Sequence, residues 1–243
     1  MKFEQYKIAN EIKQSLEELG FKKPTDIQYK AIPSILQGDD VLAIAQTGTG
    51  KTAAFAIPII DMLQTIPRDA QVGASIRCLV MVPTRELAIQ ITTVFEQLAK
   101  YTHVRIASTI GGVKEDKQIE ALQQGADILI ATPGRMFDLR SRGILNVHAC
   151  EILVLDEADH MLALGFYRDI IDIIRHLPKE RQTLFFSATI HEHIKDLAYS
   201  IVRNPIRIQI SPKDPVSKNV DHAVAFIEMD DKRFFLERFI KEH

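Results

Sequence analysis

Short apolar runs alternate along the chain with longer stretches whose apolar residues recur at helical spacing. Val41–Ala45, Cys78–Val82 and Ile152–Leu155 are almost continuously apolar, which is typical of strands buried on both faces. The other runs with strand character are Val104–Ser108, Asp127–Ala131, Thr183–Phe186 and Ile206–Ile210. Strands that alternate with helices favour an α/β fold, in which a parallel sheet carries helices on both faces.

The stretches between these runs predict helices that cover the sheet. The first, Ile8–Leu19, places its apolar residues on one helical face and is followed by Gly20, a favourable C-terminal stop. Thr25 is a suitable N-cap for a second helix that runs to about Leu36. The remaining predicted helices are Thr52–Leu63, Arg85–Lys100, Lys114–Leu122, Arg135–Arg140, Phe166–His176 and Ile194–Val202.

The pattern changes after Pro205 and the last strand. Two prolines and mixed charge make residues 211–218 resemble a linker. Residues 222–228 alternate like a strand, and residues 231–243 start a charged amphipathic helix. A lone strand and helix cannot bury a core of their own. We therefore expect residues 1–210 to form one domain. Residues 211–243 are expected to be a linker and the truncated start of a second domain, or an addition packed against the first.

Composition limits the function classes. The chain has 243 residues, of which 46% are hydrophobic and 26% charged, as in globular proteins with a sizeable core. The formal net charge of −2 argues against a protein that coats nucleic acid through general basicity, so any such contact must use a local patch. The first residues do not resemble a signal peptide, and no apolar run is long enough to span a membrane. The two cysteines form no CxxC pair and fit a reducing cytoplasm.

A glycine-bearing turn follows the first strand and precedes a helix. Such a turn directs successive backbone N–H groups, and the positive end of the helix dipole, toward one point. Lys51 adds a mobile cation for the outer phosphates, and the Thr52 hydroxyl is placed to ligate Mg²⁺. The residues expected to hold a nucleotide's phosphates are Ala45, Gln46, Thr47, Gly48, Thr49, Gly50, Lys51 and Thr52.

Carboxylates and hydroxyls follow two of the later strands. After Ile152–Leu155 come Asp156, which is expected to hold Mg²⁺ through water, and Glu157, which is expected to orient and deprotonate the attacking water. After Thr183–Phe186 comes Ser187-Ala188-Thr189, whose hydroxyls are expected to bond Asp156 or Asp159. Taken alone, either segment fits a surface turn or a helix N-cap as well as it fits a nucleotide site. Because parallel strands end at one edge of their sheet, the segments together predict a shared magnesium–triphosphate site.

The ordered set of motifs resembles the first RecA-like domain of DEAD-box ATP-dependent RNA helicases. The resemblance runs from about Phe3 to Ile210, in the style of bacterial members of the RhlE type. The matching segments are Phe3 and Gly20–Gln28 (the Q motif), Pro83–Ala88 (motif Ia), Gly111-Gly112 (the GG motif), Thr132–Arg135 (motif Ib), Asp156–Asp159 (the tetrad that names the family) and Ser187–Thr189 (motif III). The resemblance implies a RecA-like P-loop domain.

The resemblance also implies roles for individual residues. Gln28 is expected to read the adenine edge, Phe21 to stack on the base, and Lys23 to belong to the same adenine segment. The residues implied in ATP hydrolysis are Lys51, Asp156, Glu157, Asp159, Ser187 and Thr189. The residues implied in gripping the RNA backbone, without reading its sequence, are Pro83, Thr84, Arg85, Gly111, Gly112, Thr132, Pro133, Gly134 and Arg135.

Members of the family have a second RecA-like domain that carries arginine fingers and the other half of both sites. No such motif follows Thr189 in this chain. Because arginine fingers contribute on the order of a thousandfold to phosphoryl transfer, we expect residues 1–243 alone to bind ATP, to hydrolyse it poorly and to unwind nothing. This piece is also expected to be monomeric.

Two other readings of the sequence stay open at this point. One is a P-loop ATPase that acts on a protein or a small molecule, with the matches to motifs Ia and Ib incidental. The other is a non-catalytic module that binds RNA or a partner. The Gln28 segment and Thr132–Arg135 favour a helicase over the first of these, and Lys51, Asp156 and Glu157 argue against a member that has lost catalysis.

Overall fold

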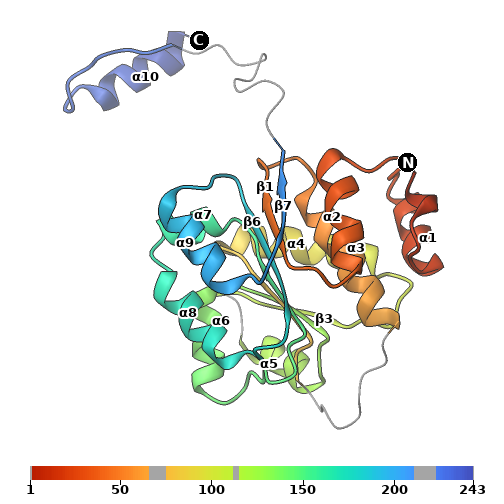
Figure 1. The fold of residues 1–243 in the computed structure, drawn as a ribbon. Coiled ribbons are helices and arrows are strands. Elements are labelled where there is room, and N and C mark those ends of the chain that lie inside the picture. The colour runs from red at the N-terminus through yellow and green to blue at the C-terminus, as the bar shows by residue number, and fades with distance from the viewer. Residues whose placement is uncertain (1, 66–74, 112–114, 211–222, 243) are drawn as a thin grey trace. The chain divides into compact units, whose positions relative to one another are not determined.

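The computed structural model describes residues 2–65, 75–111, 115–210 and 223–242. Contacts divide the chain into two compact units, Met1–Ser211 and Pro212–His243. The larger unit is built on one parallel sheet of seven strands in the order β3-β4-β2-β5-β6-β1-β7 (Figure 1). The strands are β1 Val41–Ile44, β2 Cys78–Met81, β3 Ile106–Thr109, β4 Ile128–Ala131, β5 Ile152–Leu155, β6 Gln182–Ser187 and β7 Ile206–Gln209.

Helices cover both faces of the sheet, so the predicted fold class is confirmed (Figure 1). Side chains of α1 to α4 pack in one apolar cluster, and side chains of α5 to α9 pack in the other. The helices are α1 Asn10–Glu18, α2 Asp26–Leu36, α3 Lys51–Thr65, α4 Arg85–Leu98, α5 Glu115–Gln123, α6 Pro133–Ser141, α7 Ala158–Ala163, α8 Tyr167–His176 and α9 Glu192–Ile201, with a short 3₁₀ helix at Phe3–Gln5.

The apolar runs of the sequence became strands because both of their faces are buried. In β1, Val41 and Ala43 face the cluster of α1 to α4, whereas Leu42 and Ile44 face the opposite cluster. Polar alternation would leave one of these clusters incomplete, which is why the sequence shows continuous runs instead. The predicted strands and helices of residues 8–210 are confirmed, with ends that differ by a few residues. The helix α7 and the 3₁₀ helix were not predicted.

A buried aspartate ties three strands together at the edge opposite the strand ends that carry the motifs. Asp40 directly precedes β1; its Oδ1 accepts the backbone N–H of Thr183 at 2.7 Å, and its Oδ2 accepts that of Arg203 at 2.6 Å. Thr183 lies in β6, and Arg203 precedes β7. The carboxylate therefore links the start of β1 to β6 and to the segment that leads into β7.

Replacing Asp40 by alanine is expected to lower the free energy of unfolding by about 2 kcal/mol, because two inner N–H groups lose their acceptor. Chemical denaturation of both proteins measures the difference. Asp39→Ala is the matched control, since the Asp39 carboxylate makes no hydrogen bond within the described residues. Equal stability of the two variants would contradict this role for Asp40.

The smaller unit contains one helix in its described part, α10 Lys232–Glu242. The sequence predicted this helix, which is confirmed, and a strand over residues 222–228, which is wrong: residues 223–228 have no regular structure. Apolar side chains alternate there, but no neighbouring strand pairs with them in the described part of the chain, and an isolated strand has no partner for its backbone groups. The predicted linker, residues 211–218, lies outside the described residues. No described helix combines the length and the apolar character needed to cross a membrane.

Candidate functional site

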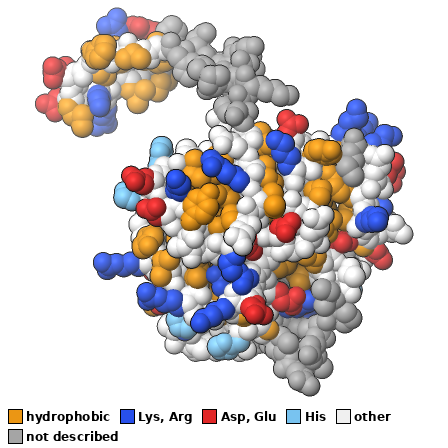
Figure 2. Space-filling model, in the orientation of Figure 1, with side chains coloured by type: hydrophobic (Ala, Val, Ile, Leu, Met, Phe, Trp, Pro, Cys, Tyr) orange, Lys and Arg blue, Asp and Glu red, His pale blue; other side chains and the backbone are white. Residues whose placement is uncertain are grey.

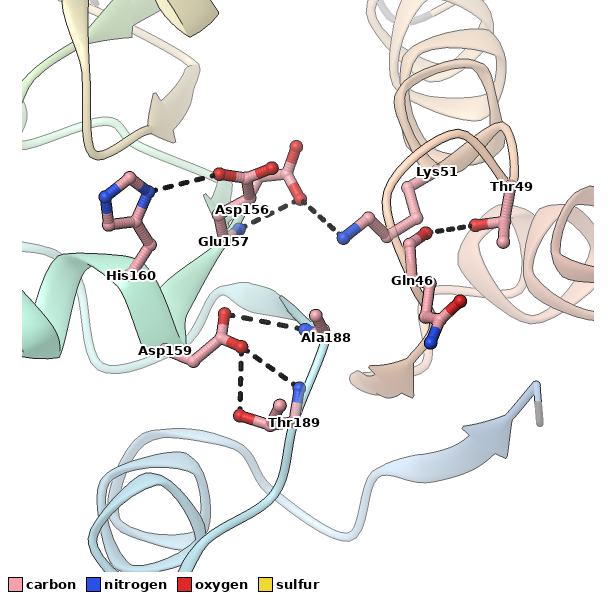
Figure 3. A network of polar contacts seen from close by, with 9 residues as sticks. All are labelled: Gln46, Thr49, Lys51, Asp156, Glu157, Asp159, His160, Ala188 and Thr189. Carbon is pink, nitrogen blue, oxygen red and sulfur yellow. Dashed lines mark hydrogen bonds and ion pairs between the residues drawn. The ribbon is translucent and has the colours of Figure 1, made fainter. Parts of the chain in front are cut away.

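Three of the predicted motifs meet because the strands that lead into them are neighbours. The loop before Lys51 follows β1, the acidic tetrad follows β5, and Ser187–Thr189 follows β6, which lies between the other two. Figure 3 shows Lys51 on one side and Asp156 and Glu157 on the other, facing one another across the strand ends. Lys51 Nζ lies 4.0 Å from Asp156 Oδ1. The lysine and the acids thus converge as the sequence predicted.

The phosphate-loop sequence forms a tight turn through two left-handed glycines. Gly48 has φ +79° and Gly50 has φ +93°, conformations that glycine adopts without the steric cost of a side chain. Thr49 Oγ1 closes the turn by donating to the backbone oxygen of Gln46 at 2.7 Å, and α3 begins at Lys51. Gln46, Thr47 and Gly48 are exposed, whereas Ala45 is buried. The exposed part of the loop and the start of α3 therefore border the same space.

Lys51 is a buried cation whose ammonium lacks hydrogen-bond partners among the described residues. Its side chain is 6% exposed, and Nζ makes no hydrogen bond to any described residue. The separation from Asp156 is that of a loose ion pair and exceeds a hydrogen bond. A buried ammonium without hydrogen bonds is costly, because its three donors have lost water. The site is consequently suited to an anion with several acceptor oxygens.

Asp156 is also buried, and its surroundings disfavour its charge. Burial raises the pKa of its carboxyl to about 6; the Lys51 ammonium opposes the rise, and the Glu157 carboxylate adds to it. One Asp156 oxygen accepts the backbone N–H of Glu157 at 3.0 Å. A divalent cation at this carboxylate would favour its charged form. The buried carboxylate is therefore better suited to binding a metal than to remaining without one.

Glu157 stands at a sharp change of backbone direction. Its φ of +51° and ψ of +48° are left-handed, which is uncommon for a residue other than glycine, and it is the N-cap of α7. This left-handed backbone lies where the chain leaves β5 and enters α7. Glu157 Oε2 lies 3.5 Å from Nδ1 of His160, one turn further along (Figure 3). This contact was not predicted from the sequence.

Asp159 connects the acidic tetrad to motif III. Its Oδ2 accepts the Thr189 hydroxyl at 2.9 Å and the Thr189 N–H at 3.0 Å, and its Oδ1 lies 3.5 Å from the N–H of Ala188 (Figure 3). Partial burial favours the neutral acid, but the Thr189 and Ser187 hydroxyls and the backbone N–H groups of Ala188 and His160 outweigh it and hold the pKa of Asp159 below its ordinary value. The expected link through Thr189 is therefore present. Ser187 is wholly buried, and its hydroxyl makes no well-formed hydrogen bond to any described residue.

The Q-motif segment touches the phosphate loop through one side chain. Gln28 is 2% exposed; its Oε1 accepts the N–H of Thr25 at 2.9 Å, and its Nε2 donates to the backbone oxygen of Gly50 at 3.1 Å. An amide has two acceptor positions and two N–H groups, so each end keeps capacity for a further partner. Phe21 is half-buried and packs edge-on against Phe3, with ring centroids 6.0 Å apart.

The other motifs gather beside this group, at the ends of β2, β4 and β3. Thr84 is the N-cap of α4, with its side chain accepting the N–H of Leu87 at 3.2 Å, and Thr132 is the N-cap of α6. Arg85 is exposed, whereas Arg135 Nη1 is paired with Asp138 Oδ2 at 2.8 Å. Pro83 and Pro133 are buried and can only shape the loops; Lys23, in the Q-motif segment, is exposed. Gly112 lies outside the described residues.

Gly111 and Gly134 are glycines that the fold of this chain does not require. Neither has a left-handed φ, and a Cβ built on either would meet no atom within 4 Å. Gly134 lies in the first turn of α6, where glycine costs about 0.5–1 kcal/mol relative to alanine. Both are exposed. Their missing side chains leave the backbone open to close approach by something outside the chain.

Comparison with known proteins agrees with this arrangement. The profile of the family described as DEAD/DEAH box helicase matches residues 25–197. The chain is 40% identical over 247 residues to a protein of Pseudomonas putida named ATP-dependent RNA helicase RhlB, covering 100% of this chain and 62% of that relative. A Shewanella protein of the same name is 40% identical over 245 residues, covering 99% of this chain and 56% of the relative. These names give no support to the RhlE type expected from the sequence.

Solved structures resemble the fold as well. A DEAD box protein from Methanococcus jannaschii matches with a TM-score of 0.80 at 34% identity, over 99% of this chain and 63% of that one. A hypothetical ATP-dependent RNA helicase from Sulfolobus tokodaii matches with a TM-score of 0.75 at 37% identity, over 84% of this chain and 57% of that one. The chain thus spans little more than half of the relatives it matches. With the family profile extending over most of its length and the motifs converging as described, this chain belongs to the DEAD/DEAH box helicase family.

Proposed function

We propose that this chain is the ATP- and RNA-binding first domain of an ATP-dependent RNA helicase. The observation that carries the proposal is Lys51, a buried ammonium without a hydrogen-bond partner in the described chain, 4.0 Å from a buried carboxylate at the end of a phosphate-type loop. A nucleotide's outer phosphates supply the acceptors that Lys51 lacks. Joined to a second RecA-like domain, this domain would couple ATP hydrolysis to local unwinding of an RNA duplex.

In the proposed ATP site, loop residues 46–50 and Lys51 hold the phosphates. The left-handed glycines present backbone N–H groups, and Lys51 adds its charge. Phe21, supported by Phe3, stacks on the adenine, while Gln28 uses its remaining acceptor and donor at the base edge. Gln28 also donates a hydrogen bond to the Gly50 carbonyl. One side chain therefore contacts both the base and the loop that binds the phosphates.

The residues present also fit Mg²⁺. No described group of three acidic, histidine or cysteine side chains could hold a metal without help. Mg²⁺ commonly keeps several waters and binds one or two protein oxygens plus phosphates, which suits the Thr52 hydroxyl and the buried Asp156. When bound, the ion neutralises charge on the phosphates. Glu157, which is not needed to hold the ion, then accepts the proton of the attacking water.

In the proposed RNA site, the phosphate backbone lies over the ends of β2, β4 and β3. The helix starts at Arg85 and Pro133 supply N–H groups, Arg85 and Arg135 supply charge, and Gly111 and Gly134 allow close approach. Lys and Arg side chains are interspersed with Asp and Glu over the face drawn in Figure 2, so binding relies on this local set rather than on overall charge. We further propose that the protein is cytoplasmic and that residues 1–243 are monomeric.

RNA-stimulated ATP hydrolysis tests the proposal. Residues 1–243 are expected to bind ATP but to show little hydrolysis with or without RNA. A longer version that continues past His243 into a second RecA-like domain is expected to show stimulation by RNA, because the second domain completes the site. Steady-state phosphate release with and without single-stranded RNA measures the effect. Strong RNA stimulation of ATP hydrolysis by residues 1–243 alone would contradict the proposal that hydrolysis requires the second domain.

A paired substitution separates a helicase from an ATPase with another substrate. Arg85→Ala with Arg135→Ala is expected to abolish RNA crosslinking in the longer protein, because both cations that face the RNA backbone are lost. ATP binding in the absence of RNA should remain, since both residues lie outside the nucleotide group of strands. Unchanged RNA crosslinking would favour a P-loop ATPase that acts on a different partner.

A further inference from the structure

One buried side chain outside all the motifs holds the backbone that enters the GG motif. Gln118, in α5, is 8% exposed. Its Oε1 accepts the N–H of Ile110 at 3.1 Å, and its Nε2 donates to the backbone oxygen of the same residue at 3.1 Å. One amide side chain thus satisfies both backbone groups of the residue immediately before Gly111.

The topology explains why an outside amide is needed at this position. β3 is the edge strand of the sheet and pairs with β4 only as far as Thr109 opposite Ala131. Ile110 lies beyond that ladder and is itself 7% exposed, so water cannot fully satisfy its backbone. A buried peptide group without partners is costly. The Gln118 amide takes the place of a paired strand. By bonding both backbone groups of Ile110, it fixes the orientation of that residue's backbone.

We propose that Gln118 is a positioning residue for RNA binding, which acts by fixing the backbone of Ile110 and Gly111 against the RNA phosphates. This inference rests on the proposed RNA site. Gly111 is exposed, and a Cβ built on it would meet no atom within 4 Å, so the described contacts that hold this part of the backbone are those of Gln118 with Ile110. Without Gln118 that backbone samples several orientations, and binding RNA must select one of them. The free energy needed to select that orientation lowers the affinity for RNA and leaves the affinity for nucleotide unchanged.

Substitution of Gln118 in the longer protein tests the inference. Gln118→Leu removes both hydrogen bonds, and Gln118→Glu keeps the acceptor but loses the donor. Either is expected to weaken binding of a single-stranded RNA oligonucleotide by about tenfold, with nucleotide affinity within about twofold of wild type. Two variants are used because one could fail to fold; circular dichroism and thermal melting show whether each is native.

Gln182→Leu is the matched control. Gln182 is another buried glutamine, whose Nε2 donates to the backbone oxygens of Ile35 at 3.0 Å and Asp39 at 2.7 Å. It is the first residue of β6, at the opposite end of the strands from the motifs. Its loss is expected to lower the melting temperature and to leave RNA affinity unchanged. If Gln182→Leu weakens RNA binding as much as Gln118→Leu does, the effect is general destabilisation and the inference is overturned.

A double-mutant cycle distinguishes positioning from support of the fold. If Gln118 acts through Gly111, then Gly111→Ala combined with Gln118→Leu should weaken RNA binding little more than either change alone. Additive losses would overturn the inference. Failure of the inference is distinguishable from failure of the proposed function: if Arg85→Ala with Arg135→Ala abolishes RNA binding but both Gln118 variants bind normally, only the inference fails. If the unaltered longer protein binds no RNA, both fail.

Discussion

Glu157→Gln is expected to lower kcat for ATP hydrolysis by roughly 100- to 10,000-fold in the longer protein, the usual contribution of a positioned general base. Glutamine keeps the shape of the side chain but cannot accept the proton of the attacking water. The side chain is 20% exposed and lies 3.5 Å from His160 Nδ1, and glutamine keeps its size, so contacts of metal and phosphate with Asp156 and Lys51 should not change. Steady-state phosphate release at saturating ATP and RNA measures kcat.

Two controls accompany this variant. Nucleotide affinity, measured by calorimetry, should stay within about threefold of wild type, because the change affects only the transition state. Asp169→Asn, an acid in the first turn of α8, makes the same chemical change outside the site and should leave kcat unaltered. If Glu157→Gln kept more than about a tenth of the wild-type kcat, a general base at this position would be contradicted.

Gly50→Ala is expected to weaken nucleotide binding by about 30- to 150-fold, which corresponds to about 2–3 kcal/mol. Gly50 has φ +93°, and a Cβ there would lie 2.6 Å from Gln28 Nε2 and 3.1 Å from Thr25 Oγ1. The loop would relax to relieve both conflicts and would have to be restored each time phosphate binds. Titration of residues 1–243 with MgADP measures the loss, because binding needs no second domain in the proposed scheme.

Gly48→Ala separates the two causes. Gly48 has φ +79° in the same loop, but a Cβ there meets nothing within 4 Å. It carries the backbone strain without the clash, so its loss of affinity should be smaller than that of Gly50→Ala. Equal losses would show that the contact between Gln28 and Gly50 contributes nothing to nucleotide binding, and unchanged affinity in both would contradict the phosphate loop itself.

Residues whose role depends on local conformation could be predicted from the sequence. The turn at 45–52 needs only a preceding strand, glycines at left-handed positions and a following helix, all of which are encoded within a short segment. The N-cap at Thr25 and the strand before Asp156 are of the same kind. The strand predicted over 222–228 failed because a strand needs a partner from elsewhere in the chain, and alternation alone does not supply one.

Contacts between distant segments were predicted incompletely or not at all. The bond between Asp159 and Thr189, 30 residues apart, was predicted with Asp156 as an alternative acceptor. The contact of Gln28 with Gly50, 22 residues away, was not predicted. The pairing of Gln118 with Ile110 left no signal, because a glutamine in a helix is ordinarily a surface residue. The contact of His160 with Glu157 likewise depends on the left-handed backbone at Glu157.

The sequence by itself determined the fold class, the phosphate loop and the family, since these follow from periodicity and from residues close together in the chain. Tertiary structure alone decided how the edge of the sheet is divided. The strand order puts β5, β6 and β1 side by side, with the residues proposed to bind nucleotide, and β3, β4 and β2 side by side, with the residues proposed to bind RNA. Which strands become neighbours is set by how the helices bury the whole sheet, and no local stretch of sequence contains that information.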